Sequence, residues 1–255
     1  AGYTRVDSIR TTALLAGMDQ SLGRQRLYGN LSLRDTRYHG NPRFDNTGYS
    51  ALVGLDWSTV ERISGSLTAY AGRSLLNFST NVFTPELAKD LETTRSLGGR
   101  IAVGLVTQYT LEAGASHREV RNSLQDTGVQ ARDFDQDTAS LGLRWRPSAV
   151  GSVTLTLGAT QGRYPRFSTD ASGFYQADRF KRQDLQLGLS YAPSSTSAFE
   201  GRLASGRTTY DLNQRRNFSG VTGNLSWNWQ VTGKLRLTLS GGRDTGQDSY
   251  ATTSA

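Results

Sequence analysis

The 255-residue sequence contains no cysteine, only five prolines and two histidines, and no long apolar run. Without cysteine there is no disulfide framework and no thiol chemistry. Without 18 or more consecutive apolar residues there is no transmembrane helix. Hydrophobic residues make up 36% of the chain and the mean hydropathy is −0.50, which is low for a protein that must fill a wide core. A barrel with a wet lumen resolves this shortage, because only its outer face must be apolar.

The scarcity of histidine also argues against an enzyme. His39 lies in an expected loop and His117 near the end of an expected strand, and no spacing suggests a pair with a serine or an acid. No group of residues has the spacing of metal ligands. The Gly-Gly-Arg pieces ending at Arg100 and Arg243 lack a following helix, so they are not phosphate loops. We therefore expect no catalytic residue, no metal and no cofactor.

What the chain does contain is a repeated alternation of apolar and polar residues. The clearest unit spans Phe218 to Arg243, where two alternating runs are joined by a short turn at Gln230 to Lys234. Side chains of a strand alternate between its faces, so each run has one apolar and one polar wall. Ten further runs of roughly 9–11 residues, the length of a tilted transmembrane strand, precede this unit: Thr11 to Ser21, Gln25 to Arg34, Gly48 to Trp57, Ile63 to Arg73, Ser96 to Leu105, Thr110 to Arg118, Asp137 to Arg146, Ser152 to Thr160, Lys181 to Tyr191 and Ala198 to Gly206.

The connections between these runs alternate in length. Short turns are expected near residues 22–24, 58–62, 106–108, 147–151, 192–196 and 230–234, and long polar loops at 35–47, 74–95, 119–136, 161–180 and 207–217. Short turns at one rim and long loops at the other are typical of outer-membrane barrels, whose short turns face the periplasm. Within the second loop, Pro85 to Glu92 is a candidate short helix, either on the surface or folded into the pore.

The pattern predicts an all-β fold, an antiparallel transmembrane β-barrel of about twelve strands in the bacterial outer membrane. Residues 1–255 are expected to form a single barrel domain. Because the first run descends from the outer rim and the last ascends to it, we expect a part of a larger barrel that lacks terminal strands. A closed twelve-stranded barrel is the alternative.

Aromatic residues end several apolar faces just before a short turn. Rings of this kind belong at the membrane–water interface. We therefore expect a periplasmic aromatic girdle that includes Trp57, Trp145, Tyr191 and Trp229.

The polar walls are rich in arginine. The net charge is +7, and of 29 basic residues only Lys89, Lys181 and Lys234 are lysines. Arginine rings select anions in pores, and tyrosine faces stack on sugars, so an acidic glycan is the expected ligand. The expected lumen residues are Arg26, Tyr28, Arg34, Tyr70, Arg100, Glu112, Arg118, Arg144, Arg146, Arg182, Asp184, Glu200, Arg202 and Arg236. In the alternative interpretation, these arginines and acids simply cross-link the lumen wall.

Several stretches together resemble the EpsL family, which comprises outer-membrane β-barrels of exopolysaccharide operons related to the β-barrel porin-2 group. They are NFSGVTGNLSWNWQVTGKLRLTLSGGRD (residues 217–244), YGNLSLRDTRY (28–38), DNTGYSALVGLDW (45–57), RSLLNF (73–78) and GRYP (162–165). The resemblance implies export of a polysaccharide, with outer-membrane lipids, an anionic polysaccharide and periplasmic export machinery as partners.

Nucleic acid is not expected as a partner, since a barrel explains the arginines without it. Two other functions stay open: an anion-favouring diffusion porin, and a non-conducting surface barrel for adhesion or biofilm contact.

Overall fold

A computed structural model describes residues 8–60, 62–76, 89–104, 108–124, 127–233 and 235–243. Its twelve strands form one antiparallel sheet in which each strand pairs with the next along the chain. The strands are β1 (Ile9–Leu22), β2 (Gln25–Tyr38), β3 (Asn46–Ser58), β4 (Ile63–Leu75), β5 (Leu91–Val103), β6 (Tyr109–Asn122), β7 (Phe134–Ser148), β8 (Gly151–Thr169), β9 (Tyr175–Ser194), β10 (Ser197–Tyr210), β11 (Phe218–Gln230) and β12 (Arg236–Arg243).

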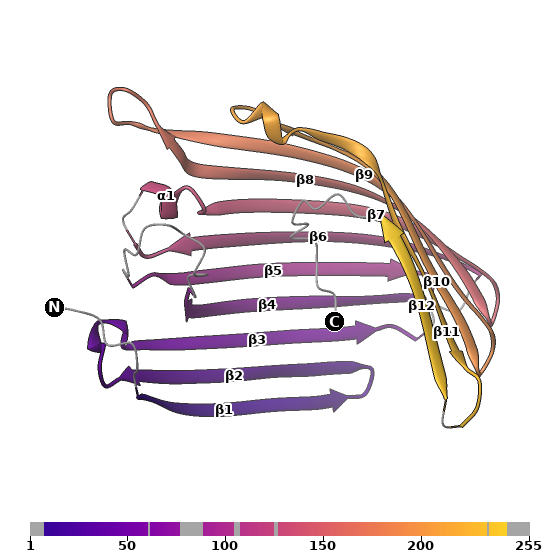
Figure 1. Cartoon of the computed structure of the whole chain (residues 1–255). Helices are drawn as coiled ribbons and strands as arrows, with labels where there is room; N and C mark the ends of the chain where they lie inside the picture. Colours follow the sequence, from indigo (N-terminus) through magenta and orange to yellow (C-terminus); the bar gives the residue numbers. More distant parts are fainter. Residues whose placement is uncertain are drawn as a thin grey trace.

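The sheet is strongly curved, with β8 to β12 turned away from the plane of β1 to β6 (Figure 1). Strands β1 and β12 do not pair with each other, so the sheet is open over the described ranges. All twelve strands predicted from the alternation are present. The alternative prediction, a closed twelve-stranded barrel, is not seen among the described residues, because β1 and β12 do not pair. The prediction that the chain is part of a larger barrel stays a prediction.

The two faces of the sheet have the opposite exposure to that of a water-soluble protein. On β7, Leu141 and Leu143 are 49% and 46% exposed, whereas Ser140 is half-buried and Gly142 is buried. Leu143 pairs in turn with leucines of β8, β9 and β10, so the apolar positions line up across strands. We call this apolar, exposed side the outer face and the polar, more sequestered side the inner face. Exposed apolar surface of this extent fits lipid rather than water.

The strands extend further than the apolar alternation predicts, so one expected loop is wrong. Residues 161–180 are not a long loop, because β8 continues to Thr169 and β9 begins at Tyr175. They meet in a tight turn in which Asp170 accepts hydrogen bonds from the backbone of Ser172 and Phe174 at 2.9 Å, and Gly173 has φ 83°. Beyond the apolar band both faces can be polar, so the alternation ends while backbone pairing continues.

Apart from the tight turn between β8 and β9, the predicted difference between short turns at one rim and longer loops at the other is present. At one rim, which we call the turn rim, the connections include residues 23–24, 149–150 and 195–196. At the other, the loop rim, they include residues 39–45 and 211–217 and the connections that join β4 to β5 and β6 to β7. The connection between β6 and β7 contains a short helix, α1 (Thr127–Gln130).

The expected helix over Pro85 to Glu92 is wrong at its described end. Leu91 and Glu92 are the first residues of β5, where Leu91 pairs with Leu75 of β4. Pairing along a full ladder outweighs the helix propensity of a short segment. Residues 85–88 lie outside the described ranges. No helix in the described part of the chain is long and apolar enough to cross a membrane.

The loop-rim connections after β2 and β10 are built alike. Each contains one turn of 3-10 helix, η1 (Pro42–Phe44) or η2 (Gln214–Arg216). The residue before the next strand accepts a 2.7 Å hydrogen bond from the backbone N–H that ends the preceding strand, Asp45 from Tyr38 and Asn217 from Tyr210. These contacts satisfy backbone groups where the ladder stops.

Candidate functional site

All the residues expected to line the lumen lie on the inner face. The pairing register places Arg26, Arg100 and Asp184 on one ladder across the sheet, and Arg144 and Arg202 on another. Because neighbouring residues of a strand point to opposite faces, the register fixes which side chains share a surface. The inner face is therefore a continuous polar wall that carries arginines from rim to rim.

The most closely connected group lies on the inner face near the turn rim and is centred on Glu112. This side chain is only 14% exposed and lies between Arg100 of β5 and Arg144 of β7. Arg100 donates a hydrogen bond to Glu112 Oε2, and Arg144 Nη2 lies 2.9 Å from Oε1. Arg146 donates to the buried Thr110 hydroxyl at 3.2 Å. One carboxylate thus holds two guanidinium groups in fixed positions.

This group lines a hollow of about 420 Å³ together with two residues that the sequence did not indicate. Arg24, in the turn between β1 and β2, donates to the Thr59 carbonyl oxygen at 3.0 Å and so links the first two turns. Asp56 of β3 lies within 3.9 Å of Arg26. We call the hollow formed by Arg24, Asp56, Arg100, Glu112, Arg144 and Arg146 the turn-rim basin. Four arginines against two acids give it a net positive charge.

Of the other residues predicted for the inner face, some form ion pairs and some do not. Arg26 forms an ion pair with Asp19 at 2.5 Å, and Arg182 forms one with Asp184 at 3.2 Å. Among the described residues, four further predicted residues form no ion pair: Arg34, Glu200, Arg202 and Arg236. Some arginines therefore cross-link the wall, as the alternative interpretation holds, while others keep their donors available to a ligand.

The two predicted tyrosines cover glycines of the inner face. Tyr28 lies over Gly54 of the next strand, so that a Cβ placed there would come within 2.1 Å of its ring. The hydroxyl of Tyr70 covers Gly72 in the same way at 2.3 Å. Only glycine leaves room for a ring held flat against a strand. Arg26 stacks over Tyr28 at 5.1 Å from the ring centroid.

A larger aromatic group lies near the loop rim, and the sequence pattern did not predict it. Phe134, Tyr164, Phe180 and Tyr210 form a chain across β7 to β10, with successive ring centroids 5.4–6.0 Å apart. Arg216 lies over Tyr210 at 4.7 Å and over Tyr164 at 5.5 Å. We call these five residues the loop-rim aromatic cluster. Rings interleaved with guanidinium groups suit a sugar ring that carries a carboxylate.

The aromatic residues predicted for the membrane interface lie on the outer face toward the turn rim. Tyr191 stacks on Phe199, Phe199 on Trp227, and Trp227 next to Trp229, with centroid distances of 6.4, 5.5 and 5.4 Å. Trp145 of β7 pairs with Tyr109 of β6. Trp57 packs over Gly65 of β4. Their assignment to the interface stays a prediction that fits this arrangement.

One histidine has a partner that its spacing in the sequence did not suggest. His117 Nδ1 lies 2.8 Å from Asp137 Oδ1, and the two side chains are 52% and 75% exposed on the outer face. The outer-face ladder continues from this pair to Leu97 on one side and to Gln161 on the other, so no serine flanks it there. Over the described ranges no three histidine, aspartate or glutamate side chains are grouped as metal ligands.

Solved structures with the same fold provide the decisive comparison. A structure titled "Copper transporter OprC" matches 93% of this chain with a TM-score of 0.51 and 15% identity. The ferric-catecholate import receptor Fiu from E. coli K12 matches 92% with a TM-score of 0.53 and 10% identity. The chain has the fold of a bacterial outer-membrane β-barrel. It spans about half the length of these structures, which it covers to 45% and 54%.

The apolar outer face agrees with this fold, and the chain is a protein of the bacterial outer membrane. No family model and no curated protein sequence matches it. The resemblance to the EpsL family therefore stays a prediction.

Proposed function

We propose that this protein conducts an anionic exopolysaccharide across the outer membrane along its arginine-rich inner face. The observation that carries the proposal is the distribution of cations from rim to rim. The turn-rim basin offers four arginines at the periplasmic entrance, and Arg202 and Arg34 continue the path without an ion-pair partner in the described chain. The loop-rim aromatic cluster lies at the far end. The similarity to two solved structures named as a transporter and an import receptor supports a role in transport.

The strength of the contacts suits passage rather than retention. A conducting surface must bind well enough to admit its substrate and weakly enough to release it. An exposed ion pair contributes about 0–1 kcal/mol, so one sugar carboxylate moves easily from one arginine to the next. The internal acids Glu112 and Asp184 already occupy some guanidinium groups, which weakens each site further. A polyanion thus meets many weak sites in sequence.

The test is single-channel conductance of the refolded chain in planar bilayers. A polyuronate oligosaccharide is compared with a neutral oligosaccharide of the same length. We expect stable steps that only the polyuronate interrupts, and residence times about tenfold shorter in the Arg202→Gln, Arg236→Gln variant, since two exposed pairs are lost. Arg207→Gln, on the outer face, serves as the control and should block like the wild type.

Two results would contradict the proposal. Steps that the polyuronate does not interrupt indicate a general anion porin. No steps from protein that is demonstrably folded indicate a surface barrel without a conducting lumen.

A further inference from the structure

A second basic surface lies on the opposite side of the sheet, where the apolar band ends on β8, β9 and β10. On each of these strands the outer-face positions follow the same order toward the loop rim. On β9, Leu185 is followed by Gln183 and then by Lys181 and Arg179. On β8 the order is alanine, glutamine and Arg163, and on β10 it is leucine, serine and Arg207. The four cations, Arg163, Arg179, Lys181 and Arg207, form what we call the outer-face basic cluster.

All four side chains are exposed, and none forms an ion pair with a residue of the described chain. The acids on the neighbouring part of this face are largely occupied. Asp135 is 2.5 Å from Arg121, and Asp137 is paired with His117. Asp135 also lies directly opposite Arg163 in the pairing of β7 with β8, and Asp211, next to the end of β10, lies beside Arg179.

The register places like charges directly opposite each other. Arg163 of β8 pairs with Arg179 of β9, and Lys181 follows two residues later on the same face. Like charges at directly opposed positions of a sheet are destabilising. An anion bound between them removes this repulsion, and guanidinium groups hold phosphate through two parallel hydrogen bonds. The arrangement therefore favours a phosphate-bearing ligand.

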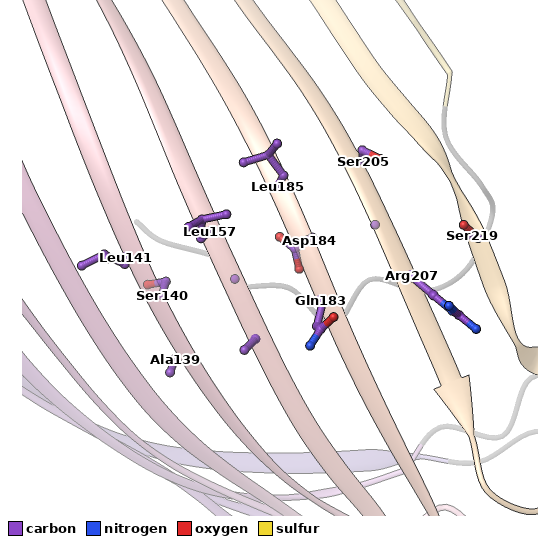
Figure 2. Close-up of a pocket in the computed structure, with 13 residues that line it drawn as sticks. Ala139, Ser140, Leu141, Leu157, Gln183, Asp184, Leu185, Ser205, Arg207 and Ser219 are labelled. Atoms are coloured by element: carbon purple, nitrogen blue, oxygen red, sulfur yellow. The ribbon is translucent and has the colours of Figure 1, made fainter.

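A shallow hollow of about 680 Å³ adjoins the cluster, lined mainly by outer-face residues and, between them, by Ser140, Gly158, Asp184 and Gly206 of the inner face. Figure 2 shows Leu141, Leu157 and Leu185 in one row across β7, β8 and β9, with Gln183 and Arg207, a member of the cluster, in the next row. The hollow thus has an apolar part made of leucine and alanine and a polar, cationic end. That division matches a lipid, with acyl chains along the leucines and a charged headgroup at the arginines.

We propose that the outer-face basic cluster and its adjoining hollow bind a phosphorylated, multiply acylated glycolipid of the outer leaflet. The loop rim faces outward in outer-membrane barrels, so this end of the apolar band lies at the headgroups of that leaflet. The occupant is a membrane lipid, not a soluble phosphate, because the cations adjoin an apolar hollow continuous with the band. This site is independent of what passes along the inner face.

Native mass spectrometry of the full chain in detergent tests the site, with bisphosphorylated lipid A as the probe. Dephosphorylated lipid A and the deacylated disaccharide bisphosphate are the comparison ligands. We expect the protein to retain bisphosphorylated lipid A and to retain neither of the two comparison ligands. The triple variant Arg163→Gln, Arg179→Gln, Lys181→Gln should bind it roughly 100-fold more weakly, since each cation near a lipid headgroup contributes about fivefold.

The matched control removes the same charge from the inner face, with Arg34→Gln, Arg202→Gln and Arg236→Gln, and should bind like the wild type. Equal retention of dephosphorylated lipid A, or equal loss in both triple variants, would overturn the proposal. Equal retention of the deacylated disaccharide would overturn the role of the hollow. Folding is checked by thermal unfolding without lipid, where the outer-face variant should unfold close to the wild-type temperature, because loss of the Arg163–Arg179 repulsion offsets loss of the attraction between Arg163 and Asp135.

Discussion

Replacing Glu112 by glutamine perturbs the centre of the turn-rim basin while conserving its volume. The carboxylate is 14% exposed and serves two arginines at once, whereas the side chains of Arg100 and Arg144 are 52% and 36% exposed. Glutamine retains one acceptor oxygen but carries no charge. The substitution therefore removes the charge from both contacts and leaves two guanidinium groups next to each other.

The size of the effect follows from these exposures. A hydrogen bond to a charged group contributes about 1.5–3 kcal/mol when it is well buried, and an exposed ion pair about 0–1 kcal/mol. With a largely buried acceptor and half-exposed donors, the two contacts together should stabilise the fold by about 1–2 kcal/mol. We expect Glu112→Gln to lower the free energy of unfolding by about this amount, measured by denaturant titration in lipid vesicles.

The same substitution should strengthen binding of an anionic glycan. Two arginines lose their internal competitor, so the residence time of a polyuronate in single-channel records should rise about fivefold, the equivalent of one charge contact in water. Glu200→Gln makes the same change of charge on the inner face at a residue with no ion pair in the described chain, and its stability should stay within about 0.5 kcal/mol. Equal stability of the two variants, or a shorter residence time in Glu112→Gln, would refute this reasoning.

Three further predictions concern the two faces and the rims. Leu155→Arg on the outer face should cost about 2–4 kcal/mol of stability in lipid, whereas Thr156→Arg on the inner face should cost little; similar unfolding curves would contradict the assignment of the faces. Gly54→Ala should displace the ring of Tyr28 and cost about 1–3 kcal/mol, seen as a lower denaturation midpoint; an unchanged midpoint would mean that the ring does not rest on the strand. Asp133→Ala should lower stability by about 1–3 kcal/mol, because two hydrogen-bond donors at the end of β6 lose their acceptor. The measurement is amide hydrogen exchange at the end of β6, and an exchange rate equal to that of the wild type would contradict this prediction.

The strands and their faces were predictable because side chains alternate with a strict period of two. In β9 the leucines at positions 185, 187 and 189 fix both the strand and its orientation, and the structure places them on the outer face as expected. Strand ends were less predictable. A membrane imposes alternation only within its apolar thickness, so the polar extension of β8 to Thr169 left no such pattern.

The candidate site was predictable only where its residues lie within alternating runs. Glu112 and Arg144 were assigned correctly to one face, but their pairing depends on the register between β6 and β7, which a single sequence does not specify. Arg24 was missed because it lies in a turn. Phe134 and Tyr210 were missed because both fell within expected loops. Polar residues at a strand end and polar residues of a loop have the same composition, and only backbone pairing distinguishes them.

In the function proposed above, the inner face lines an aqueous path for an anionic glycan while the outer face contacts lipid. Because the chain has no cysteine, single cysteines introduced as Gln186→Cys on the inner face and Leu187→Cys on the outer face can be compared directly in lipid vesicles. Their reaction with a water-soluble maleimide is measured with and without a polyuronate. We expect rapid labelling at position 186 that the polyuronate slows, and little labelling at position 187. Equal labelling at both positions would contradict the assignment of the two faces, and labelling at 186 that the polyuronate leaves unchanged would contradict the glycan path along the inner face.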